Sequence, residues 1–190
     1  MNDMALVSPA MMGSMMAAMM LPSFAPTLWR YHRALGATRV PRAGGWTLVF
    51  ALGYAVVWTM IASALYAVSD ASVPSWAAGA VVLWAGVIQC TQWKAIRLVR
   101  CRDAFAPGCV MPCGPRTAFR DGWRFGIDCG LSCAAPTAIL FVVGLMDVRA
   151  MAAITLVITA ERLAPMGTRI ARVTGAVAFC AGLIMCLRAS

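Results

Sequence analysis

The sequence predicts an all-α integral membrane protein, a polytopic transmembrane helical bundle of about six spans in one domain, residues 1–190. Of its 190 residues, 62% are hydrophobic and 12% are charged. The charged share is about half of that in soluble globular domains. Mean hydropathy is +0.78. Apolar runs of about 20 residues, the length needed to cross a bilayer, alternate with arginine-bearing segments.

The first expected span, residues 5–24, is rich in methionine. Six methionines occur as MMxxMMxxMM, namely Met11, Met12, Met15, Met16, Met19 and Met20. Their spacing places them on two adjacent stripes of a helix. Thioethers are soft ligands that hold copper(I). Methionine is also a flexible packing residue, so both interpretations stay open. Pro22 is expected to end or kink this helix.

The second and third spans are expected over residues 46–68 and 76–93. The second carries no charge and is a plain membrane span. Polar residues gather near the end of the third span. Gln89, Cys90 and Gln92 are candidates to hydrogen-bond and orient metal ligands without binding the metal themselves. An interfacial position at a helix end explains the same residues.

Residues 94–126 are expected to form one long basic loop. The segment carries seven Lys or Arg residues, and several prolines and glycines interrupt it. Within it, residues 116–125 are predicted to form a short interfacial helix, because aromatic residues alternate there with arginines.

The fourth span, residues 127–146, opens with the polar cluster Asp128-Cys129-Gly130-Leu131-Ser132-Cys133. Cys129 and Cys133 are four residues apart and therefore share one face of a helix. A polar cluster inside a membrane-length segment is costly and marks a site by default. Thiolates favour copper(I) or zinc. The alternative is that cysteine serves there as a small apolar packing residue.

The last two spans are expected over residues 150–163 and 171–187. The first of them ends in Glu161 and Arg162. Glu161 either pairs with an arginine or faces inward at the level of Cys129. Cys180 and Cys186 are six residues apart, so they share a helical face poorly and are read as packing residues.

Basic residues alternate between the segments that flank the spans. From the N-terminus to the C-terminus, the Lys and Arg counts are 0, 4, 0, 7, 1, 3 and 1, which account for all 16. The positive-inside rule then puts both termini outside and the three basic loops in the cytoplasm. This distribution, rather than nucleic-acid binding, explains the net charge of +9. Five spans, with the first helix re-entrant or interfacial, are the alternative.

This topology predicts a metal path through the membrane. Thioethers follow the depth of the first span, and thiols lie at the inner face, where the reducing cytoplasm keeps them available. The predicted metal ligands are Met12, Met15, Met16, Met19, Met20, Asp128, Cys129, Cys133 and Glu161. Copper(I) is the expected ion, and zinc is the alternative.

Several segments resemble a known family in the same order. Residues 15–23, MMAAMMLPS, resemble the MMxAMMLPS signature of an uncharacterised bacterial family of predicted metal-binding integral membrane proteins. Residues 88–94, 126–134, 144–147 and 160–163 resemble its later segments. Arg162 and Trp93 depart from its usual Lys and Pro, and an additional N-terminal span common in the family is not seen. The resemblance implies metal binding in the bacterial inner membrane and no established activity.

Three functions are compatible with these features. The first is copper(I) binding, transport or delivery to a cuproenzyme, with the lipid bilayer, a metal ion and a metallochaperone or membrane complex as partners. The second is a structural subunit of a larger membrane complex. The third is a thiol oxidoreductase that cycles Cys129 and Cys133 between thiols and a disulfide. The four-residue helical spacing of the two cysteines argues against it, because that spacing is marginal for a relaxed disulfide. No hydrolase or kinase motif appears, so a non-enzymatic role is expected.

Overall fold

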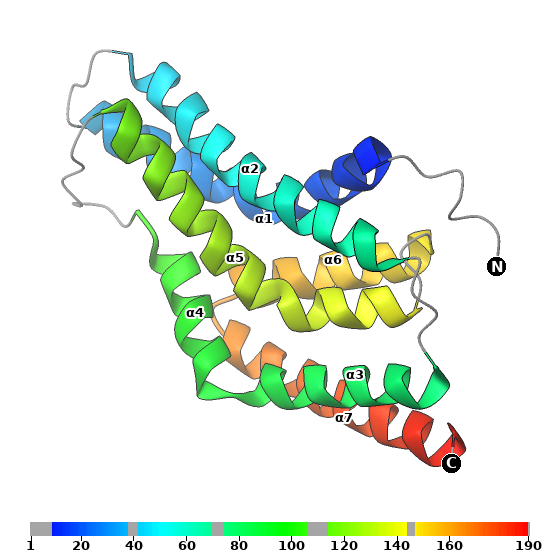
Figure 1. Ribbon diagram of the computed structural model, residues 1–190. Coiled ribbons are helices and arrows are strands. Elements are labelled where there is room, and N and C mark those ends of the chain that lie inside the picture. The colour runs from blue at the N-terminus through cyan, green and yellow to red at the C-terminus, as the bar shows by residue number, and fades with distance from the viewer. Residues whose placement is uncertain (1–8, 38–41, 70–73, 106–113, 144–146, 190) are drawn as a thin grey trace. The chain divides into compact units, whose positions relative to one another are not determined.

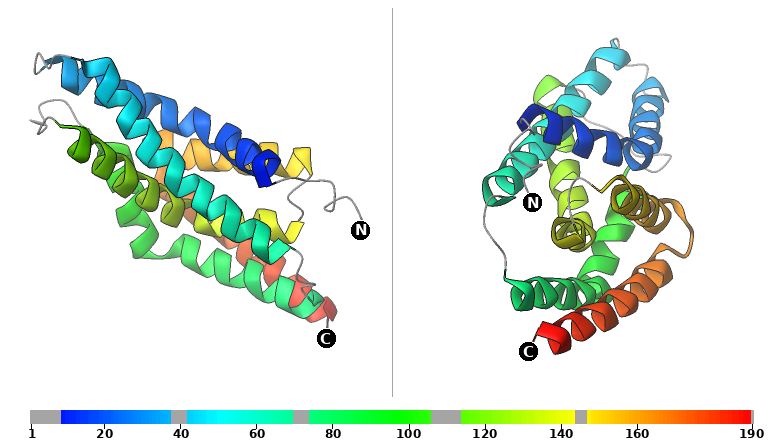
Figure 2. Two further views of the ribbon diagram at one scale, coloured as in Figure 1. Left: turned by 45° about the horizontal axis from the view of Figure 1, so that its top comes forward. Right: turned by 90° about the vertical axis from the view of Figure 1, so that its right-hand side faces the viewer.

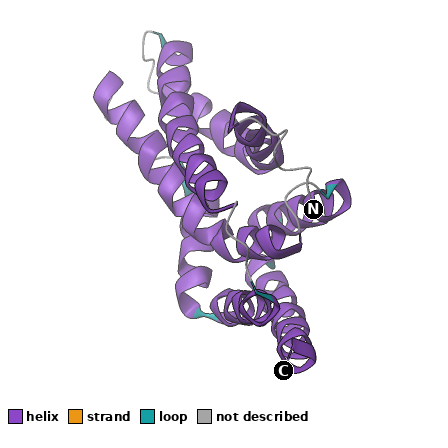
Figure 3. Ribbon diagram, turned by 45° about the vertical axis from the view of Figure 1, so that its right-hand side comes forward, coloured by secondary structure: helices purple, strands orange, loops and turns teal. Residues whose placement is uncertain are grey.

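A computed structural model describes residues 9–37, 42–69, 74–105, 114–143 and 147–189, and every regular element in that part of the chain is an α-helix (Figure 3). The elements are α1 (Pro9–Ala37), α2 (Ala43–Ser69), α3 (Ser75–Cys90), α4 (Gln92–Asp103), α5 (Pro115–Val143), α6 (Val148–Leu163) and α7 (Gly167–Ala189) (Figure 1). The all-α prediction is confirmed.

The helices belong to two compact units. The first unit consists of Met1–Asp70 and Asp103–Gly130 and contains α1, α2 and the first half of α5. The second unit consists of Ala71–Arg102 and Leu131–Ser190 and contains α3, α4, the rest of α5, α6 and α7.

Three of the described helices are long and apolar enough to cross a membrane. These are Ala43–Ala67, Pro115–Val143 and Gly167–Arg188, and Trp76–Cys90 is a shorter apolar helix. The prediction of about six spans is therefore met in part.

Two helix boundaries differ from the prediction. Helix α1 continues through Pro22 and Pro26 to Ala37 instead of ending near residue 24. Proline is tolerated inside membrane-type helices where side chains and neighbouring helices satisfy nearby backbone groups. The Ser23 hydroxyl donates to the carbonyl of Met20 at 3.0 Å, while the carbonyls that lose a helical donor at the two prolines are those of Ala18 and Pro22.

The long basic segment is also more ordered than expected. Its first part forms α4, and residues 116–125, predicted to be a separate interfacial helix, are the first turns of α5. The buried stripe of α4 consists of Lys94, Leu98 and Cys101, at positions i, i+4 and i+7. One buried stripe with arginines on the other faces is the pattern of an amphipathic helix. This helix was not predicted from the sequence because the segment as a whole carries many charges.

Glycines allow α2 and α5 to pack closely in the first unit. A Cβ atom added at Gly122 would collide with the backbone of Phe50, and one added at Gly53 would collide with the backbone of α5. Gly126 and Gly130 follow at four-residue intervals and face Val57 and Ile61. Such small-xxx-small patterns let helix backbones approach in membrane proteins.

In the second unit, α3 and α7 lie side by side (Figure 2). Gly86 faces the backbone of Phe179, and Gly182 faces the backbone of Leu83. Residue numbers rise along one helix as they fall along the other, so α3 and α7 are antiparallel. Leucine-sized residues at these glycine positions would force the two backbones apart.

Replacing Gly122 with alanine tests the close approach in the first unit. We expect Gly122→Ala to lower the free energy of unfolding by about 1–3 kcal/mol, because the new methyl group requires α2 and α5 to separate. The matched control is Gly44→Ala, also in a helix, where an added Cβ meets nothing within 4 Å. That control should be neutral or slightly stabilising. Denaturant titration in mixed micelles measures both, and equal effects would contradict the close approach.

Candidate functional site

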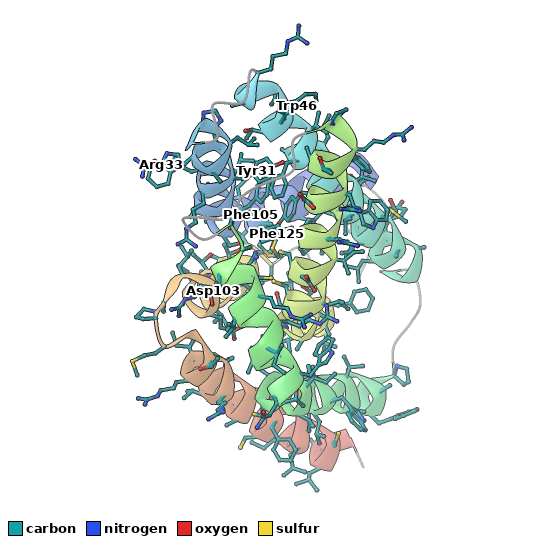
Figure 4. All side chains as sticks on the ribbon, turned by 90° about the vertical axis from the view of Figure 1, so that its left-hand side faces the viewer. Tyr31, Arg33, Trp46, Asp103, Phe105 and Phe125 are labelled. Carbon is teal, nitrogen blue, oxygen red and sulfur yellow. The ribbon has the colours of Figure 1, made fainter. Side chains whose placement is uncertain are left out.

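Stacked aromatic rings fill the centre of the first unit. Phe24 of α1 stacks on Tyr54 of α2, with ring centroids 4.0 Å apart. Phe125 of α5 lies 6.3 Å from Phe24 and 5.9 Å from Tyr54. Tyr31 and Phe105 extend the cluster, and Figure 4 shows both near Phe125. The rings join α1, α2 and α5 and exclude water from the space between them.

The same contacts give the direction of each helix. The ring pairs Tyr31–Phe50, at 4.3 Å, and Phe24–Tyr54 show that α1 runs antiparallel to α2. The facing positions Gly122–Phe50 and Gly130–Ile61 show that α5 runs parallel to α2. Moving one turn toward the N-terminus of α1 therefore leads to the same level of the unit as moving one turn toward the C-terminus of α2 or of α5.

One turn beyond the aromatic rings lie Met20, Trp58 and Cys129, four residues from Phe24, Tyr54 and Phe125 respectively. The step is about 6 Å along each helix. Met20 and Cys129 have no exposed surface, and Trp58 is 4% exposed. We call these three residues the sulfur layer. It brings a thioether of α1 and a thiol of α5 to one depth of a single unit.

Two polar groups adjoin the sulfur layer. The Tyr54 hydroxyl lies 3.4 Å from the Cys129 sulfur, within hydrogen-bond distance for a thiol. The Trp58 indole Nε1 is buried and has no hydrogen-bond partner among the described residues. A buried donor without a partner is uncommon and is expected beside a position that takes a ligand.

The other predicted methionine ligands lie on α1. Met16 and Met19 are buried, at 3% and 4% exposure. Met16 is four residues before Met20 and continues its stripe along the helix. The backbones of Met12 and Met15 belong to α1, and their side chains lie outside the described residues.

This arrangement suits a soft monovalent ion. Within the described residues, no group of three His, Cys, Asp or Glu side chains converges as a metal site. Thioether and thiol sulfurs are soft ligands of the kind that copper(I) accepts. Copper(I) bound by neutral thioethers and one thiolate carries no net charge. That neutrality lowers the cost of burying the ion in an apolar core.

A buried polar network occupies the second unit. The Lys94 ammonium of α4 pairs with the Glu161 carboxylate of α6 at 2.7 Å, and the two side chains are only 1% and 2% exposed. Lys94 also donates to the side-chain oxygen of Gln89, whose amide nitrogen donates to Glu161. Thr174 of α7 donates to Glu161 at 2.9 Å. Four helices are joined by this network, and its charges balance.

Residues that the sequence analysis grouped as metal ligands belong to two different units, with Met20 and Cys129 in the first and Cys133 and Glu161 in the second. Glu161 lies in the second unit, where its carboxylate pairs with Lys94, the ammonium that sequence reasoning had assigned to a loop. Cys133 is 2% exposed and lies one turn after Cys129 in α5. Asp128 is half-buried. The signal that could have identified Lys94 is its place on the apolar stripe of α4.

The three residues predicted to support the metal ligands differ in burial and in contacts. The Gln89 side-chain amide donates a hydrogen bond to Glu161. The Cys90 thiol is exposed and lies 3.7 Å from the backbone oxygen of Arg172, and Gln92 is exposed at the start of α4. Tyr54, which contacts Cys129, was not singled out, because one tyrosine in an apolar span carries no periodic signal.

Comparison with known protein families gives a match over most of the chain. The family model described as PpoB2, copper chaperone, matches residues 10–185, nearly the whole chain. No curated protein and no solved structure matches.

Proposed function

The chain belongs to the PpoB2 copper chaperone family, and from that premise we propose that it is a membrane chaperone that holds copper(I) in the sulfur layer. Met20 and Cys129 supply ligands in this proposal, and Met16 and Met19 supply further thioethers along α1. Cys133 is the next buried thiol of α5 and belongs to the second unit. Copper is the cargo of the protein and is passed to an acceptor.

The observation that carries the proposal is the common depth of Met20 and Cys129. They are 109 positions apart in the sequence, yet the ring contacts and the glycine contacts place both one turn beyond the aromatic cluster. Both are fully buried. A buried thioether and a buried thiol at one depth are the ligand types that select copper(I) over hard cations.

We propose the location and the partners from the same features. Three helices of membrane-spanning length support a place in the bacterial inner membrane, with the basic segments in the cytoplasm. Burial of the ligands prevents release of copper into water, so the ion leaves by ligand exchange with a protein acceptor. A cuproenzyme or a metallochaperone that presents its own thiols or thioethers is the expected acceptor.

Substitution of one methionine tests the sulfur layer. We expect Met20→Leu to weaken copper(I) binding about tenfold, equivalent to about 1.4 kcal/mol, because leucine keeps the volume and removes the thioether. The measurement is competition with a chromogenic copper(I) chelator in detergent under anaerobic, reducing conditions. Metal analysis of the same samples compares copper with zinc.

The matched control is Met166→Leu, since Met166 is 50% exposed. It should bind copper(I) as the unmodified protein does. Equal affinity of the Met20 variant and the control would remove Met20 from the site. No binding by the unmodified protein, even after copper(I) loading, would refute copper carriage in this layer.

A further inference from the structure

A groove of about 420 Å³ lies at the corner between α6 and α7 in the second unit. Its lining includes Pro165, Met166, Arg169, Ile170 and Val173. Apart from Arg169, these are apolar, and Met166 and Val173 are 50% and 64% exposed. Exposed apolar surface of this kind marks a contact with a membrane or an apolar ligand.

The charge at the groove is positive. Arg169 is exposed, and no carboxylate among the described residues forms an ion pair with it. The nearby acidic group, Glu161, is neutralised by Lys94. Arg102 brings a second guanidinium to the rim, since its Nη1 donates to the carbonyl oxygens of Ala164 and Pro165, at 3.4 and 2.9 Å. An anion is the complementary ligand.

The helix ends favour the same charge. Arg169 lies in the first turn of α7, whose N-terminus is the positive end of a 23-residue helix dipole. The C-terminus of α6 is the negative end of its helix dipole. The Arg102 guanidinium offsets this charge by donating to the carbonyl oxygens of Ala164 and Pro165, which follow α6. Two guanidinium groups and one helix N-terminus therefore add positive potential at the groove.

We propose that this groove binds one anionic phospholipid, with its phosphate at Arg169 and Arg102 and an acyl chain along Met166, Ile170 and Val173. The proposal rests on the membrane location proposed above. Free phosphate would satisfy the arginines and leave the apolar floor exposed. A zwitterionic headgroup would place its own cation beside two guanidinium groups, which is unfavourable.

The experiment is native mass spectrometry of the full-length protein, released from nanodiscs that contain equal amounts of phosphatidylglycerol and phosphatidylcholine. We expect one retained phosphatidylglycerol per chain. Arg169→Gln should lower its retention about fivefold, the effect of one arginine at an anionic lipid surface. The matched control is Arg188→Gln, an exposed arginine at the other end of α7, which should retain the lipid.

A second variant tests the acyl-chain position. Val173→Glu places a carboxylate in the groove and should also lose the lipid, while the fold should be kept because Val173 is exposed. Equal retention of both lipids, equal loss in the Arg169 and Arg188 variants, or displacement of the lipid by millimolar inorganic phosphate would each overturn the proposal. Copper(I) affinity measured on the same samples should be unchanged in Arg169→Gln, which separates this site from the copper site.

Discussion

Lys94→Met is expected to destabilise the protein by about 3–5 kcal/mol, because it leaves the carboxylate of Glu161 buried without its ammonium partner. The methionine retains most of the apolar stem of the lysine, so the loss is mainly electrostatic. Gln89 and Thr174 would still donate to Glu161, but neither carries a compensating charge. Denaturant unfolding in mixed micelles measures the change.

A double-mutant cycle isolates the ion pair. Glu161→Leu alone should destabilise the protein to a similar extent, while Lys94→Met/Glu161→Leu should cost much less than the sum of the two. The matched control is Arg100→Met, which removes an exposed cation from the same helix and should change stability by less than about 0.5 kcal/mol. Additive single effects, or single effects as small as the control, would contradict an interacting buried pair.

Cys129→Ser is expected to lower copper(I) affinity at least about 100-fold, since serine keeps the shape and the hydrogen bond to Tyr54 but is a hard, poor ligand for a soft ion. The effect should exceed that of Met20→Leu because the thiolate supplies the charge that neutralises copper(I). Chelator competition under anaerobic conditions measures it. Cys180→Ser, at an exposed thiol of α7, is the matched control and should bind normally.

Proton release gives an independent measure of the same site. A thiol must lose its proton to bind the metal, so copper(I) loading should release about one proton per ion in weakly buffered solution. The Cys129→Ser variant should release none. Release of about two protons would mean that Cys133 binds at the same time as Cys129 and that the site carries a net negative charge. Unchanged release in the variant would exclude Cys129 as the ligand.

The sequence predicted the helical class and most helix positions. Long apolar runs have few alternatives to helix, because a backbone in lipid must satisfy its own hydrogen bonds. Boundaries were less accurate where proline or charge interrupted the pattern. Pro22 lies inside α1, which continues to Ala37, and α4 was missed because its buried stripe contains Lys94. Local composition cannot show which distant residue compensates the buried charge of a lysine such as Lys94.

The sequence by itself determined the chemistry available to this protein, which is a methionine-rich first helix, two thiols one turn apart in α5, and a surplus of arginine. Only the tertiary structure decided how these groups combine. The relative directions of α1, α2 and α5 place Met20 at the same depth as Cys129. The ion pair of Lys94 in α4 with Glu161 in α6 likewise joins residues far apart in the chain. Helical periodicity defines the face of one helix, whereas its partner and register depend on contacts between residues far apart in the chain.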